Sequence, residues 1–228
     1  MMKRRRLRGI LLLSVLAFLM LAANEPLIAA PTMPTVDGFV RDGLGSPKDG
    51  VPDDVIAGTT VQALDNLGVS FPFEDRGIIE FELPSLSGPL TGADLVLPVF
   101  SAMGPYPFTI DVFTYTGDGV LSLSDFNAGS LYTSFAYSGE SVVTLDVTSF
   151  IGGLYTSGDD YAGFNFQFAV PSTIALNGPY VSFGSLEHGP AAYLAITPTV
   201  EPIPAPGAVL LTSIGAGFVG WLRRRRTL

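Results

Sequence analysis

The feature that most constrains the fold is a two-residue alternation of apolar and polar side chains, repeated in short segments through the middle of the chain. Its clearest apolar positions are 79, 81 and 83; 93, 95, 97 and 99; 143, 145 and 147; 164, 166 and 168; and 192, 194 and 196. Neighbouring side chains of a β-strand point to opposite faces, so each segment predicts a strand with one buried face. Because no helical periodicity is sustained there, the middle of the chain is predicted to be all-β.

Further strands are expected near residues 36–41, 58–64, 67–72, 108–115, 131–137 and 180–184. Clusters of turn-forming residues separate the segments, for example at 43–47, 87–89 and 177–179. Roughly nine to eleven short strands in one domain predict a jelly-roll-type β-sandwich over residues 36–197. Residues 148–155 are expected to form a short helical turn capped by Thr148 or Ser149.

Residues 1–30 have the organisation of a secretory signal peptide. A basic stretch, residues 3–8, precedes an apolar stretch from Ile10 to Ala23, and small residues follow at Ala29 and Ala30. The apolar stretch is shorter than the roughly 20 residues of a typical membrane helix, so a cleaved N-terminal signal helix is favoured over a permanent anchor. Both alternatives predict that the body of the chain is exported across the inner membrane.

The other end of the chain has three parts in a fixed order. A Pro-rich linker and sorting motif occupies residues 198–204, and an uncharged run follows from Ala205 to Leu222. A helix of that length spans about 27 Å, close to the hydrocarbon thickness of a bilayer. The cluster Arg223, Arg224, Arg225 and Arg226 would stay on the cytoplasmic side as a membrane stop. Residues 205–228 are therefore predicted to form a transmembrane helix with an Arg-rich cytoplasmic end. An ordinary single-pass anchor is the alternative to a sorting signal.

This C-terminal segment resembles the PEP-CTERM sorting signal of Gram-negative bacteria. Glu201 and Pro202 match the second and third positions of the Pro-Glu-Pro motif, while Val200 replaces the first proline. The Gly-rich apolar run and the terminal arginines match the remaining parts. The resemblance implies an exosortase-type processing enzyme as partner, cleavage near Glu201–Pro202, and only transient anchoring in the inner membrane. The mature protein would then lie at the cell surface or outside the cell.

The middle of the chain resembles a second family. The segments 76–86, 91–97, 145–164 and 182–194 are similar to motifs of secreted modules of the DNRLRE, or disaggregatase-related, type. These modules are carbohydrate-binding-module-like β-sandwiches. The resemblance implies a jelly-roll fold and leaves the ligand open, because such sandwiches serve many functions.

Charge is distributed very unevenly. Residues 31–200 contain 19 acidic side chains and only three basic ones, Arg41, Lys48 and Arg76. A surface of this kind repels phosphates, so we expect no nucleic acid partner. The chain has no cysteine, which excludes disulfides and thiolate chemistry. Arg76 is expected to have a structural role, paired with an aspartate near Asp75 or with Asp146.

Few residues suggest catalysis. The single histidine, His188, lies beside Glu187 in a Gly-Pro turn, and one histidine cannot build a zinc site. We therefore expect no enzymatic activity. Structural calcium is the one cofactor hypothesis, because oxygen ligands crowd the N-terminal loops. The candidate ligands are Asp37, Asp42, Asp49, Asp53 and Asp54. The alternative, a solvated acidic loop, is favoured.

Two functions from different classes remain open for the β-domain. The first is a non-catalytic cell-surface or extracellular-matrix protein, sorted through its C-terminal signal. The alternative is a carbohydrate-binding module that recognises an extracellular polysaccharide. Sugar binding would need exposed aromatic rings, and the candidates are Tyr106, Tyr115, Tyr132, Tyr137 and Tyr155. Packing within the domain is the favoured role for these tyrosines.

Overall fold

The computed structural model describes residues 30–43, 48–66, 72–104, 106–169, 179–199 and Gly215. Residues 27–198 form one compact unit. Its elements are β1 (Val36–Gly43), β2 (Asp54–Ala57), β3 (Val61–Asn66), β4 (Phe73–Glu82), β5 (Leu90–Met103), β6 (Phe108–Thr116), η2 (Leu123–Asn127), β7 (Ser130–Tyr137), β8 (Val142–Asp146), α2 (Thr148–Ser157), β9 (Tyr161–Phe168), β10 (Tyr180–Phe183) and β11 (Tyr193–Pro198). The prediction of an all-β domain is confirmed.

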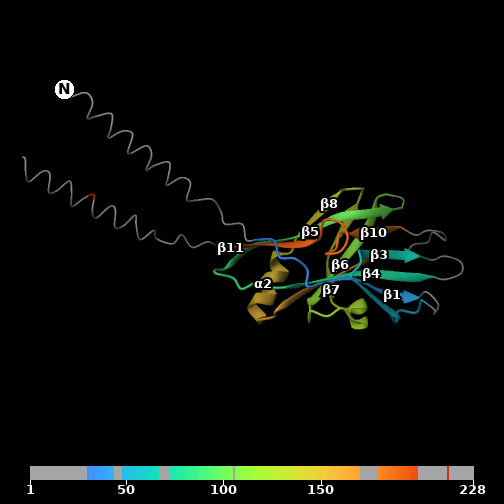
Figure 1. Ribbon diagram of the computed structural model, residues 1–228, viewed down its shortest axis with the longest axis horizontal. Coiled ribbons are helices and arrows are strands. Elements are labelled where there is room, and N and C mark those ends of the chain that lie inside the picture. The colour runs from blue at the N-terminus through green and yellow to red at the C-terminus, as the bar shows by residue number, and fades with distance from the viewer. Residues whose placement is uncertain are drawn as a thin grey trace, which may run out of the picture. The chain divides into compact units, whose positions relative to one another are not determined.

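Strand β4 is the branch point of a curled antiparallel sheet (Figure 1). One edge of β4 pairs with β1, which also pairs with β2. The other edge pairs with β3 near Asp75 and with β9 from Gly77 onward. The β9 branch continues through β6 to β7, and the β3 branch continues through β10 to β5. Two layers therefore diverge from one strand.

The long strand β5 extends the second layer in both directions. Its C-terminal part, near Ser101, pairs with β10, whereas its N-terminal part lies between β11 and β8. Apolar side chains from both layers form the main core, with Phe81, Phe164 and Phe166 on one side and Leu95 and Phe183 on the other. Helix α2, gold in Figure 1, contributes Ile151 and Leu154 to this core. The core thus closes between two layers, as alternating strands require.

A second, smaller core lies on the opposite face of β4. It contains Val40, Ile78 and Phe126, all fully buried, with Leu121 packed against them. Phe126 belongs to η2, so the segment between β6 and β7 covers this part of the sheet. Both faces of β4 are consequently buried.

The sequence predicted most of the strands but missed some elements. β2 and η2 were not expected, and β4 begins at Phe73 rather than at the first alternating residue. The strand predicted near residues 67–72 falls mostly outside the described residues. The expected side-chain cap of the helical turn is wrong: α2 begins after Val147 without a capping side chain. Thr148 instead accepts a hydrogen bond from the backbone N–H of Ala93, at 2.9 Å, which joins α2 to β5.

The predicted signal peptide and the predicted transmembrane run lie outside the described residues, apart from Ala30 and Gly215. Within the described part of the chain, no helix combines the length and apolar character needed to cross a membrane.

We expect the Phe126→Ala substitution to destabilise the domain by about 3 kcal/mol, because it removes a fully buried ring from a small core and leaves a cavity. Urea unfolding of the full chain measures this change. Leu131→Ala, at a position that is 55% exposed, is the control and should change stability by less than about 0.5 kcal/mol. Equal effects of the two substitutions would contradict the proposed covering role of η2.

Candidate functional site

An open pocket lies on the outward face of β3, β10 and β5. Its volume is about 280 Å³. The lining residues are Thr60, Gln62, Leu64, Phe100, Ser101, Tyr180 and Ser182. The residues between them in β3 and β10, such as Val61 and Val181, point into the main core. The same alternation that builds the core therefore presents hydroxyl, amide and aromatic groups on the other face.

A chain of polar contacts supports one side of this pocket. The amide nitrogen of Gln62 donates to Asp75 Oδ2 at 2.7 Å. Asp75 also accepts two hydrogen bonds from the Arg41 guanidinium, at 2.6 and 2.8 Å. Because an ionised carboxylate only accepts hydrogen bonds, this contact fixes which end of the Gln62 amide is the donor. The side chain of Gln62 is thus held from behind by a paired, buried carboxylate.

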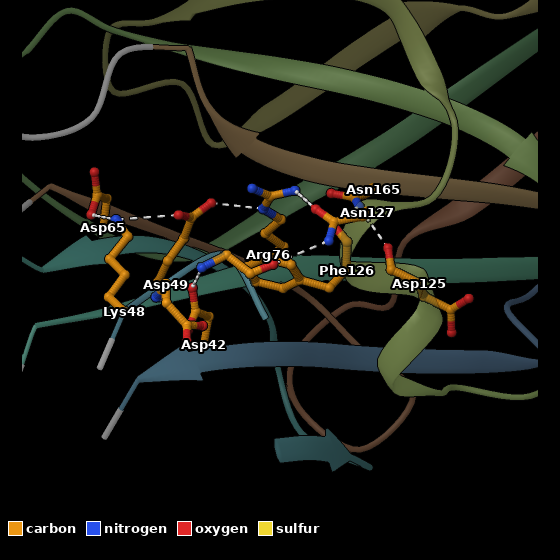
Figure 2. Close-up of polar contacts among 11 residues, drawn as sticks. Asp42, Lys48, Asp49, Asp65, Arg76, Asp125, Phe126, Asn127 and Asn165 are labelled. Carbon is orange, nitrogen blue, oxygen red and sulfur yellow. Dashed lines mark hydrogen bonds and ion pairs between the residues drawn. The ribbon is translucent and has the colours of Figure 1, made fainter. Parts of the chain in front are cut away.

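A second polar network crosses the end of β4 (Figure 2). Lys48 bridges Asp65, at 2.5 Å, and Glu74, at 3.2 Å. Glu74 also pairs with Arg76 at 2.7 Å. Arg76 donates to the backbone oxygen of Phe126 and lies 3.9 Å from the centre of its ring. This network secures the η2 segment to the sheet.

The expected partner of Arg76 was wrong, although its expected structural role fits these contacts. Asp75, the neighbour in sequence, points to the other face of β4 and pairs with Arg41. Asp146 lies on β8, where its carboxylate accepts from the backbone N–H of Thr148. Alternation along a strand explains the error, because residues 75 and 76 face opposite sides.

Four of the five predicted calcium ligands lie around the C-terminal end of β1, and the fifth, Asp37, lies near its start. Asp42 accepts from the backbone N–H groups of Asp49 and Gly50, and Asp49 accepts from that of Val51. Asp53 accepts from the N–H of Gly43, and Asp54 is exposed at the start of β2. No group of three or more acidic or histidine side chains suited to a metal ion occurs in the described ranges. Calcium binding therefore stays a prediction.

Asp37 lies apart from the other four, at the beginning of β1. Its carboxylate is buried and accepts from the backbone N–H of Leu186 at 2.9 Å. Burial raises the pKa of Asp37 to about 6, and the nearby charge of Glu187 acts in the same direction. The hydrogen bond from Leu186 opposes this rise. Asp37 thus anchors the loop that carries His188.

The predicted aromatic candidates are mainly packing residues. Tyr137 is buried, and Tyr132 and Tyr155 donate to backbone oxygens of Asp146 and Pro84. The ring of Tyr115 lies over Gly163, where an added Cβ would be 2.5 Å from ring atom Cε2. Tyr106 is 46% exposed and stacks on Phe108. None of these tyrosines lines the pocket.

Sequence reasoning missed the pocket residues. The available signal was Phe100, a large apolar residue directly after the alternating positions 93 to 99. His188 is exposed, as expected of a loop histidine, and its ring centre is 6.4 Å from that of Phe100. The sorting motif Val200, Glu201 and Pro202 and the cluster Arg223–Arg226 lie outside the described residues.

No protein-family model matches this chain, and no curated protein matches it.

Asp37 predicts a specific pH dependence of stability. An unfolded aspartate releases its proton near pH 3.8, whereas folded Asp37 holds it until about pH 6. The folded chain binds more protons between these values, so this carboxyl lowers stability as the pH rises through the interval. We expect Asp37→Asn to reduce the fall in melting temperature between pH 4.5 and 7.

Melting curves of the full chain across this pH range measure the effect. Asp160→Asn, at an exposed carboxylate, is the matched control and should leave the pH dependence unchanged. Identical pH profiles for the wild-type and Asp37→Asn chains would show that burial of Asp37 has no energetic consequence.

Proposed function

We propose that this chain is an exported, non-catalytic protein of the cell surface or extracellular matrix. Its C-terminal segment would be read by an exosortase-type enzyme, with transient anchoring in the inner membrane before release. The sequence of that segment, with Glu201-Pro202, an uncharged run and four arginines in order, carries the proposal. The resemblance of this segment to the sorting signal of PEP-CTERM proteins supports the proposal.

The boundaries of the β-domain are compatible with such processing. The last strand ends at Pro198, two residues before Val200. At the other boundary, Thr32 exchanges backbone hydrogen bonds with Leu194, both at 2.9 Å. Signal cleavage after Ala23 or near Ala29–Ala30, together with cleavage near residue 201, would therefore spare every described strand of the domain.

We also propose that the domain is a jelly-roll-type β-sandwich of the DNRLRE-like class. Its two diverging layers and long shared strands support this finer assignment. A non-catalytic role is supported by the way its acidic groups are used. Asp37, Asp42 and Asp75 each accept backbone or guanidinium hydrogen bonds that hold the fold together.

Carbohydrate recognition is a second candidate, and the pocket on β3, β10 and β5 favours it. Its described lining residues are uncharged. They provide four side-chain hydroxyls, one amide and two aromatic rings, from Thr60, Gln62, Phe100, Ser101, Tyr180 and Ser182. Such a mixture of apolar surface and a few polar groups is typical of small-molecule sites. A polysaccharide outside the cell is the ligand that best suits an exported protein of this kind.

For the sorting proposal, we expect Glu201→Ala to accumulate unprocessed chain in the inner membrane, because the substitution alters the proposed cleavage motif. Intact-mass measurement distinguishes a product ending near residue 201 from a chain ending at Leu228. Glu140→Ala, on the exposed β7–β8 turn, is the matched control and should be processed normally. Wild-type chain recovered from the cell surface with Leu228 still attached would refute processing.

For the carbohydrate proposal, we expect the full chain to bind a defined set of glycans on an array. The chain should be kept in a detergent whose headgroup contains no sugar, because a glycoside detergent would compete for the same site. Absence of binding to every glycan on the array would favour the purely structural matrix role.

A further inference from the structure

We infer that the pocket on β3, β10 and β5 is a binding subsite for one uncharged sugar unit, with Phe100 as its stacking platform and Ser182 on its floor. This inference rests on the proposed carbohydrate recognition and assigns it to particular side chains. Four features of the pocket carry it: a β-bulge, a set of positioned polar groups, an unpartnered hydroxyl, and described lining residues that are all uncharged.

The β-bulge places Phe100 in the pocket. Ser182 of β10 pairs with Ser101 of β5, but the next residue, Phe183, pairs with Val99. Phe100 is therefore an extra residue in β5. In a regular strand Phe100 and Ser101 would face opposite sides, whereas here both line the pocket. Bulges commonly redirect a side chain beside a functional site.

The Phe100 ring is supported and yet accessible. It is 53% exposed, an unusual state for a phenylalanine in a domain with so large a core. His188 lies beside it, and a Cβ added at Gly189 would be only 2.9 Å from ring atom Cδ2. Gly189 also has a φ of +79°, which favours glycine at this position. The loop thus leaves room for the ring, and about half of the Phe100 side chain stays exposed.

Three of the polar side chains are held in place before any ligand arrives. The Gln62 side chain donates a hydrogen bond to Asp75, and Asp75 is in turn held by an ion pair with Arg41. The hydroxyls of Ser101 and Tyr180 are 2.6 Å apart and share a hydrogen bond. Polar groups that are already oriented lose little conformational entropy on binding, which favours recognition of a ligand rich in hydroxyls.

Ser182 supplies the most informative atom. Its side chain is buried, and its Oγ has no hydrogen-bond partner in the described part of the chain. A buried hydroxyl without a partner costs stability, so it calls for an explanation. A sugar hydroxyl, bound directly or through a water, would provide the missing partner at the floor of the pocket.

Size and charge define the ligand class. A volume of about 280 Å³ is at the lower limit for small-molecule sites, and it suits one sugar unit of a longer glycan. No lysine or arginine is among the described lining residues, and the surrounding domain is strongly acidic. Uronates and phosphates would be repelled, so the ligand is a neutral glycan.

The test compares pocket variants of the full chain on an array that contains neutral and uronate-rich glycans. We expect Phe100→Ala to weaken binding of neutral glycans by at least about tenfold, the equivalent of roughly 1.4 kcal/mol. Ser182→Ala should weaken it by about fivefold. The same serine substitution should leave the melting temperature unchanged or raise it, because it removes an unpartnered buried hydroxyl. If Ser182 had only a structural role, its substitution would not weaken glycan binding while leaving the melting temperature unchanged or higher.

Leu131→Ala and Ser130→Ala on β7 are the matched controls, since both positions are exposed and distant in sequence from the pocket. Unchanged glycan binding in both pocket variants would overturn this subsite while leaving carbohydrate recognition intact. Preferential binding of uronate-rich glycans would overturn the neutral ligand class. A wild-type chain that binds no glycan would overturn the carbohydrate proposal itself, and this subsite with it.

Discussion

The burial of β4 on both faces is the constraint on which the rest of the structure depends. One face contributes Ile79 and Phe81 to the main core, and the other contributes Ile78 to the small core beneath η2. A strand buried on both faces must satisfy any polar side chain that it carries. Glu80 meets this requirement through one oxygen: its side chain is fully buried, and Oε2 accepts from the backbone N–H groups of Asp118 and Gly119. The segment that covers β4 is therefore held by the strand that it covers.

The few basic side chains of the domain all pair with carboxylates of the same strand. Arg41, Lys48 and Arg76 all pair with carboxylates of β4 residues, namely Asp75 and Glu74. Arg41 and Lys48 come from β1 and its following segment, so these pairs join neighbouring parts of the chain to β4. Removing one partner of a partly buried ion pair destabilises the folded protein strongly, because the other charge is left without compensation. These three basic side chains are therefore engaged in ion pairs within the described domain.

Alternation predicted the strands well, because it depends only on which residues face the core. It could not predict what covers the other face. Alternation with Ile79 and Phe81 would place Glu80 on an open face of the strand, but Glu80 is fully buried against residues 117–119 of the segment between β6 and β7. Similarly, the aspartates of residues 37–54 were grouped by sequence proximity, while β1 separates Asp37 from the rest by most of its length. Such long-range contacts are absent from any local pattern.

The pocket was missed for a related reason. Residues 93, 95 and 97 face the core, yet the bulge shifts the phase so that Ser101 faces outward and Ala102 packs against the core. A pattern of period two cannot anticipate one extra residue. The shift brings an aromatic ring to a surface whose hydroxyls and amide are already in place. Carbohydrate recognition here would thus originate in a local departure from the regular strand, built on a sheet whose core is otherwise fully specified by alternation.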